Sequence, residues 1–166
     1  MDMDFEEREF QSIRITPHWL QYVIIQLPWL VLCAIGFLVA GDDTFLYKRL
    51  ILYASWGLLL YLSYQALEMG RISYVITGEQ LIYKHGVLFH CSDYMELYRI
   101  VDYQENRTPM QQLVGLKNVT ILSGDKTLPK LKLIGIRSNL RILEDIRMRV
   151  EYNKKKRSIY EITNRF

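Results

Sequence analysis

The stretch "YQALEMGRISYVIT", residues 64–77, contains the point at which the pattern of the chain changes. Up to Leu67 the stretch belongs to an uncharged apolar run, which is typical of a membrane helix. After "EMG" the apolar residues alternate with others, so that Ile72, Tyr74 and Ile76 share one face of an expected strand. Three extended residues span only about 10 Å. We therefore expect a sheet that begins almost at the membrane surface.

Two uncharged apolar runs precede this sheet. No acidic or basic residue occurs between Arg14 and Asp42, and the run "WLQYVIIQLPWLVLCAIGFLVAG" lies inside that interval. A helix rises 1.5 Å per residue, so about 20 residues cross the roughly 30 Å hydrocarbon core of a bilayer. Two buried helices of a soluble protein are the alternative, but a chain of 166 residues is too small to cover both. We predict a transmembrane hairpin over residues 18–67, with helices at about 18–41 and 50–67.

Basic residues near the ends of the apolar runs set the expected orientation, because Lys and Arg are enriched on the cytoplasmic side. The connection between the helices carries Lys48 and Arg49, whereas the chain after Leu67 is strongly basic. We expect a multi-pass protein with both termini on the cytoplasmic side. Cys33 lies within the first apolar run and Cys91 far along the chain, so a disulfide between them is not expected.

Small residues mark the faces through which the two helices are expected to pack. Such residues let two backbones approach closely in lipid, and the candidates are Gly36 and Ala40 on the first helix and Ala54 and Gly57 on the second. These faces pack either against each other within the hairpin or between copies of the chain. Transporters and channels usually hold ionisable groups inside their spans, and neither run contains one, so we expect neither activity.

The chain beyond the hairpin is predicted to form about seven short strands and one C-terminal helix. The strands are expected at "RISYVIT", "LIYKH", "GVLF", "DYMEL", "RIVDYQE", "NVTILS" and "LPKLKLIGI". The helix is predicted from Ser138, as the N-cap, to about Lys156, with apolar residues at near-helical spacing. The predicted parts are an N-terminal segment at 1–17, the hairpin, a domain at 68–157 and a C-terminal tail at 158–166.

The segment "RTPMQQLVG" interrupts the alternation between two of these strands. We expect the strand before it to point Val101 and Tyr103 inward, and the segment itself to form a short helical turn. Gly115 would end the turn in a left-handed conformation. Met110 and Leu113 are therefore candidate partner-contact residues, which either cover the core of the domain or contact the membrane or another protein.

The segments "YVITGEQLIYKHGVL", "LYRIVDYQ" and "LVGLKNVTI", together with the order of the elements, resemble the membrane-associated bacterial pleckstrin-homology-like domain family. The resemblance covers roughly Met69 to Tyr152. It implies an α+β pleckstrin-homology-like domain, in which the C-terminal helix closes one end of a bent antiparallel sheet or partly open barrel. It also implies the bacterial inner (cytoplasmic) membrane. Eukaryotic relatives that bind phosphoinositides use a basic loop between the first two strands, whereas "TGEQ" is short and acidic, so that mode of binding is not expected.

Residues capable of catalysis or metal binding are scattered along the sequence. The three histidines, His18, His85 and His90, and Cys91 do not have the recurring close spacing of a zinc site. No nucleophile, phosphate-cradling or metalloprotease motif is present. We therefore expect no catalytic residue, no metal, no cofactor and no small-molecule substrate. Nucleic acid is not an expected partner either, because no stacking aromatic residues accompany the basic ones.

Several basic residues near the C-terminus are candidates for contact with anionic lipid. A Lys or Arg contributes roughly 1 kcal/mol near an anionic leaflet, but only within about a Debye length of its surface. Solvated surface charges are the alternative interpretation of the same residues. The candidates are Lys126, Lys130, Lys132, Lys154, Lys155, Lys156 and Arg157.

These patterns favour a non-catalytic, membrane-anchored protein that acts as an assembly or protein-interaction module. Its expected partners are membrane lipids and either an unidentified protein or further copies of the chain. The alternative hypothesis is a lipid-binding or lipid-sensing protein that recognises anionic headgroups. Fold alone does not distinguish the two, because domains of one fold serve many functions.

Overall fold

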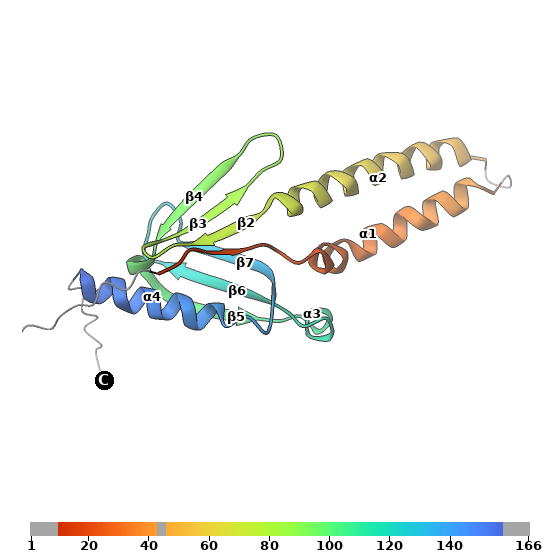
Figure 1. Ribbon diagram of the computed structural model, residues 1–166. Coiled ribbons are helices and arrows are strands. Elements are labelled where there is room, and N and C mark those ends of the chain that lie inside the picture. The colour runs from red at the N-terminus through yellow and green to blue at the C-terminus, as the bar shows by residue number, and fades with distance from the viewer. Residues whose placement is uncertain (1–9, 43–45, 158–166) are drawn as a thin grey trace, which may run out of the picture.

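The computed structural model describes residues 10–42 and 46–157. Two long antiparallel helices, α1 (Trp19–Ala40) and α2 (Lys48–Arg71), project from one end of a domain built of strands (Figure 1). The first nine residues of the predicted N-terminal segment and the whole predicted tail, 158–166, lie outside the described residues.

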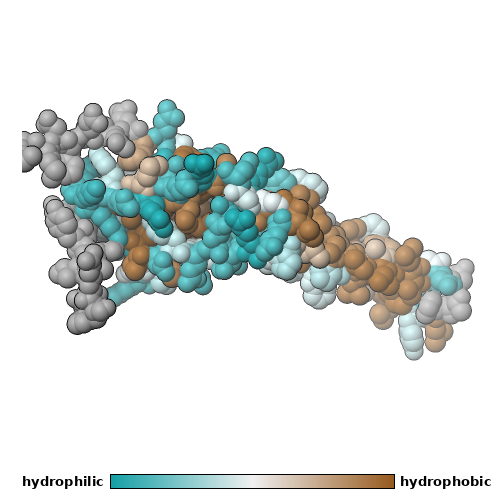
Figure 2. All heavy atoms as spheres, turned by 90° about the horizontal axis from the view of Figure 1, so that it is seen from below, coloured by the Kyte–Doolittle hydropathy of each residue, from teal (hydrophilic) through white to brown (hydrophobic). Residues whose placement is uncertain are grey.

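Both helices are long and apolar enough to cross a membrane. They contain 22 and 24 residues, which correspond to about 33 and 36 Å. A core helix of a soluble protein would be mostly buried, but only 6% and 11% of the most apolar windows of α1 and α2 are buried. The apolar surface of the helices contrasts with the more hydrophilic surface of the domain (Figure 2).

The second helix is longer than the sequence pattern predicts. "EMG", expected as an extended linker, forms the last turn of α2, and Ile72 alone separates Arg71 from the next strand. Glu and Met are good helix formers, and the Ile72 N–H donates to the Met69 carbonyl at 3.2 Å to end the helix. The domain is therefore attached more closely to the hairpin than expected.

The first sheet contains β1 (Ile13–Ile15), β2 (Ser73–Ile76), β3 (Gln80–His85) and β4 (Cys91–Glu96), in that order and antiparallel throughout. β1 lies within the segment predicted as an N-terminal extension, and it pairs with β2 across the hairpin. A three-residue strand is too short for its alternation to be recognised, and its partner lies about 60 residues away. Both helices are thus inserted between the first two strands of the sheet.

The second sheet contains β5 (Ile100–Asn106), β6 (Leu116–Ser123) and β7 (Lys130–Arg137), again antiparallel. A short 3-10 helix, η1 (Leu97–Arg99), connects the two sheets, and α4 (Ile142–Lys156) packs its apolar side on the core between them. The core is formed by apolar residues from both sheets and α4, including Ile76, Leu81, Met95, Val119, Leu133 and Ile146. The predicted fold class is confirmed.

Seven strands lie within the described residues, in agreement with the predicted number, but one of them differs from the prediction. "GVLF" is not a strand but part of the turn between β3 and β4, and β1 takes its place in the count. Gly86 has a φ of +103°, and a Cβ there would lie 1.8 Å from the Phe89 carbonyl oxygen. The chain reverses tightly at this glycine, which a side chain would prevent.

Two further predictions of detail are wrong. Val101 does not point inward but is 67% exposed, because a bulge between Ile100 and Asp102 shifts the register and leaves Ile100 buried instead. Ser138 does not cap α4: its N–H donates to the Gly115 carbonyl at 2.8 Å, and the helix begins only at Ile142.

The helical turn between β5 and β6 is confirmed as α3 (Pro109–Leu113). Thr108 and Gln111 form a capping box, in which each side chain accepts a hydrogen bond from the backbone N–H of the other. Gly115 follows with a φ of +67°.

Candidate functional site

The candidate functional site is the end of the domain from which the helices emerge, where short connections and buried hydrogen bonds join the hairpin to the sheets. Three residues connect β1 to α1, and one connects α2 to β2, so both helices leave the same sheet over very short connections. The His18 N–H donates to the Gly135 carbonyl at 2.9 Å, which ties the start of α1 to β7 as well. The hairpin is therefore joined to both sheets.

A buried network of amide side chains holds this joint together. Gln111 Nε2 donates to Gln21 Oε1 at 2.8 Å and to Asn118 Oδ1 at 3.0 Å, and the Gly135 N–H donates to the same Asn118 oxygen at 2.9 Å. All three amide side chains are buried. Because buried polar groups are costly unless paired, the network favours one arrangement of α1, α3, β6 and β7. The sequence offers only a weak signal for it, the single amide of Gln21 near the start of an apolar run.

Glycine also shapes the joint. Gly135 has a φ of +60°, and a Cβ at this position would lie 2.6 Å from the Gln21 Cβ. Because Gly135 has no side chain, α1 can begin directly against β7 at this position.

Of the four small residues predicted to mediate helix packing, the structure places only some between the helices. Gly36 faces Ser55 of α2 so closely that a Cβ at Gly36 would lie 2.3 Å from the Ser55 hydroxyl oxygen. Ala40 is half-buried, whereas Ala54 and Gly57 are exposed, and a Cβ at Gly57 would meet no atom within 4 Å. The Gly36 face is thus used within the hairpin, and the Ala54 and Gly57 face is open.

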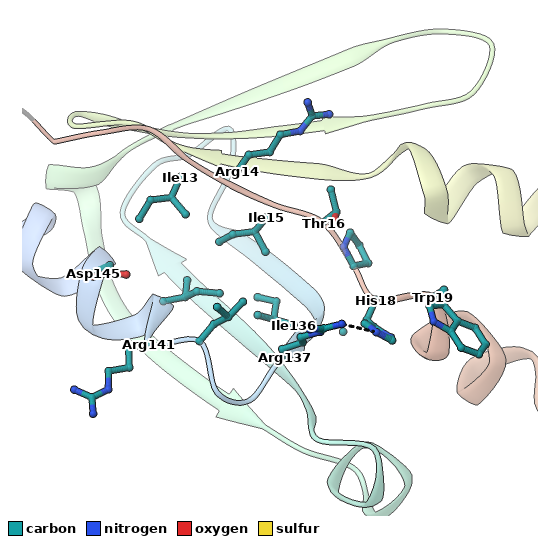
Figure 3. A pocket seen from close by; sticks show the side chains of 14 residues that line it. Ile13, Arg14, Ile15, Thr16, His18, Trp19, Ile136, Arg137, Arg141 and Asp145 are labelled. Atoms are coloured by element: carbon teal, nitrogen blue, oxygen red, sulfur yellow. Dashed lines mark hydrogen bonds between the residues drawn. The ribbon is translucent and has the colours of Figure 1, made fainter.

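A pocket of about 580 Å³ lies between the β1–α1 connection and the β7–α4 connection (Figure 3). Ile15 and Ile136 line its interior, while the side chains of Arg14 and Arg141 extend from it to opposite sides (Figure 3). Arg137 Nη2 lies 3.4 Å from His18 Nε2. Because these cations do not converge on one point, the pocket can accept an apolar group but is not arranged to coordinate a small anion.

Most of the seven basic residues predicted to contact lipid lie away from the helices. Lys156 pairs with Glu79 at 3.3 Å and Arg157 with Glu96 at 3.6 Å, at the end of α4 that lies farthest from the hairpin (Figure 1). Thr77, two residues before Glu79, follows Arg71 by six positions of mostly extended chain, which span about 20 Å. That distance exceeds a Debye length of about 8–10 Å. Lys154 and Lys155 share this end of α4, Lys126 lies in the β6–β7 turn at the same end of the domain, and Lys130 and Lys132 are exposed along β7.

The two predicted partner-contact residues, Met110 and Leu113, lie on α3 and are 54% and 83% exposed. They do not cover the core of the domain. α3 instead lies beside the first turn of α1, to which the amide network connects it.

Two buried basic residues have structural partners that the sequence did not reveal. Arg149 is buried in α4 and donates to the Thr77 carbonyl at 2.9 Å and the Gln11 carbonyl at 2.7 Å, and burial lowers its pKa. Lys117 is buried in β6 and its Nζ lies 3.1 Å from Glu105 Oε2. Arg107 and Lys117 lower the pKa of the Glu105 carboxyl.

Groups capable of metal binding do not converge in the described part of the chain. Within residues 10–42 and 46–157, no three His, Cys, Asp or Glu side chains are placed to hold a metal ion. His85 Nδ1 lies 3.8 Å from Asp93 Oδ2 on neighbouring strands, and Cys91 is the register partner of His85.

Comparison with known families gives a match over most of the chain. A family model described as "Bacterial PH domain" matches residues 19–150, a range that includes both helices as well as β2 to β7 and most of α4. Neither the comparison with curated proteins nor that with solved structures finds a match.

Proposed function

The chain belongs to the bacterial PH domain family, and we propose that it is a non-catalytic, membrane-anchored protein-interaction module of the bacterial inner membrane. PH domains are generally non-catalytic. The proposed role is to present one face of the domain, at a fixed height above the membrane, to a protein partner or to a second copy of the chain.

The anchor in this proposal is the α1–α2 hairpin, which spans the membrane twice with both termini on the cytoplasmic side. Its helices match the hydrocarbon thickness, and their exposed apolar side chains have no other cover within the described chain. An exposed apolar surface of this size would cause aggregation in water.

The observation that carries the proposal is the stiff joint between hairpin and domain. A flexible tether would let the domain search a large volume, whereas one residue after α2, three before α1 and the buried amide network fix its position. A fixed domain lowers the entropy cost of forming an ordered assembly, because less orientational freedom is lost on binding.

The outer face of the first sheet is the surface that fits a protein partner best. The strand register places Val75, Ile82 and Tyr94 side by side on β2, β3 and β4, and Tyr94 is 57% exposed. Aromatic residues next to apolar ones are enriched where proteins bind one another. We name Val75, Ile82 and Tyr94 the outer-face row.

Recognition of anionic headgroups by the seven basic residues is the alternative function, and their placement gives it less support. The cluster at the end of α4 lies about 20 Å from the end of α2, and two of its members are paired with Glu79 and Glu96. A headgroup at the membrane from which the helices emerge would not reach it.

Extraction of the tagged protein from native membranes in polymer nanodiscs tests the proposal. We expect particles that contain a second protein chain, either another copy or a reproducible partner, and we expect Tyr94→Arg to remove that chain. A matched control, Lys132→Glu on the exposed side of β7, should retain it. Particles that contain a single chain in both the wild type and the control would contradict the proposal.

A further inference from the structure

Two exposed apolar projections lie at the end of the domain nearest the helices. The first is the β3–β4 turn, residues 86–90, in which Leu88 is 79% and Phe89 83% exposed. The second is α3, with exposed Met110 and Leu113. Figure 1 shows the turn beside the end of α2 and α3 beside the start of α1. Neither projection contributes these side chains to the core.

The strand register places the β3–β4 turn level with the last residues of α2. Ser73, the first residue of β2, pairs with Lys84, so Gly86 and the rest of the turn continue past the start of β2 and alongside the helix. A cavity of about 480 Å³ confirms this position, because Gly70 and Arg71 line it together with Gly86 and His90.

α3 lies level with the first turn of α1. Gln111 of α3 is hydrogen bonded to Gln21, the third residue of α1, and Val114 lines a cavity of about 400 Å³ together with Leu20. Trp19 is exposed at the same level, and Trp is enriched at the boundary between headgroups and hydrocarbon. α1 needs nearly its full length of about 33 Å to cross the hydrocarbon, so this boundary lies close to Trp19.

The charges around the cavity beside the β3–β4 turn are of one sign. Arg14, Arg71 and Lys84 line it, together with His85 and His90, and no acidic residue does. Within residues 10–42 and 46–157, none of the three permanent cations forms an ion pair. Cations next to exposed Leu and Phe side chains suit a surface that offers phosphates above hydrocarbon.

We propose that the β3–β4 turn and α3 dip into the leaflet from which the hairpin emerges, and that Arg14, Arg71 and Lys84 bind the phosphates of anionic lipids in that leaflet. The occupant of this surface is the bilayer that the helices themselves span. The surface is distinct from the seven basic residues predicted from the sequence. It adjoins the outer-face row, because Arg14 is the register partner of Val75 and Lys84 lies two residues after Ile82 on the same face of β3. The inference rests on the proposed anchoring of the hairpin, but not on the protein-interaction role.

The membrane depth of nitroxide side chains tests the position of the two projections. The full chain is reconstituted for this measurement in nanodiscs with 30% anionic phospholipid. Single cysteines replace Leu88, Leu113, Leu60 and Val101 in a background in which Cys33→Ala and Cys91→Ser remove the native thiols. We expect the label at residue 60, in the middle of α2, to be deepest. The labels at 88 and 113 should be protected from an aqueous nickel complex at headgroup depth, and the exposed control at 101 should not.

The outcomes of this measurement distinguish a failure of the proposed leaflet contact from a failure of the proposed membrane anchoring. A deep label at 60 with water-exposed labels at 88 and 113 would overturn this inference and leave the anchoring intact. A water-exposed label at 60 would overturn both.

The enrichment of anionic lipid around the protein tests whether the three cations bind lipid phosphates. Energy transfer to a labelled phosphatidylglycerol measures this enrichment. The triple substitution Arg14→Gln, Arg71→Gln and Lys84→Gln should reduce the enrichment to the level of the bulk bilayer. The matched triple Lys126→Gln, Lys130→Gln and Lys132→Gln removes the same charge from the other lipid-contact candidates and should leave enrichment unchanged. Equal effects of the two triples, or no effect of the first, would overturn the assignment of these cations.

Discussion

Lys117 is a charged side chain that the fold buries, and Glu105 is its partner on the neighbouring strand. The Glu105 carboxyl receives hydrogen bonds from Arg107 and Lys117, which lower its pKa. A carboxyl with a lowered pKa in the folded state stabilises that state above the ordinary carboxyl pKa. This contribution is lost as the pH falls through the lowered value.

We therefore expect Glu105→Gln to destabilise the protein by about 1–3 kcal/mol at pH 7, because it leaves Lys117 buried without its counter-charge. The difference in unfolding free energy between this variant and the wild type should decrease below about pH 4.3 and vanish below the lowered pKa of Glu105. Thermal unfolding in detergent between pH 3 and 7 measures this. Glu144→Gln, at an exposed carboxylate of α4, is the control and should have little effect. A difference that does not change with pH would contradict the pairing.

Gly135 gives a second prediction at the scale of single residues. Gly135→Ala adds a Cβ that overlaps Gln21 and strains a left-handed backbone, so we expect a loss of roughly 1–3 kcal/mol and a lower melting temperature. Gly70→Ala is the control, because a Cβ there meets nothing within 4 Å and Ala favours the helix. Equal melting temperatures for the two variants would show that the joint does not depend on this contact.

At the scale of elements, the sequence predicted the structures whose periodicity extends over many residues. The two apolar helices, most of the strands and α3 with its terminal glycine are present as expected. β1 was missed because three residues show no reliable period, and its stability comes from pairing with β2 across the hairpin. The predicted strand at "GVLF" is absent because the chain reverses tightly at Gly86, and composition does not reveal the backbone geometry of that reversal.

The packing of α1 on α2 gives a prediction for the hairpin. Gly36→Leu should separate the helices at Ser55 and cost about 1–3 kcal/mol, because the contact has no room for a side chain. Gly57→Leu should be tolerated, since its position is open. Melting temperatures in detergent, with circular dichroism as the readout, compare the two. A larger effect at Gly57 than at Gly36 would place the tight contact between copies of the chain instead of within the hairpin.

At the scale of the whole molecule, the sequence located the hairpin and the domain but not the surfaces that each end presents. The seven predicted lipid-contact residues cluster near the C-terminus of the sequence, yet the direction of β6, β7 and α4 carries most of them away from the helices. Pairing of β2 with β3 brings Lys84 next to Arg71, whereas Arg14 lies far from both in the sequence and joins them because β1 and β2 pair across the hairpin. A single sequence does not reveal such long-range pairing.

The central claim is that a stiffly anchored domain presents the outer-face row to a protein. Site-specific photo-crosslinking in living cells, with benzoylphenylalanine in place of Tyr94, tests this most directly, and the same group in place of Lys132 serves as the control. We expect one discrete adduct from position 94, either with another copy or with a defined partner, and none from position 132. The absence of an adduct at 94, in a protein that is extracted from its membrane as a single chain, would contradict the account.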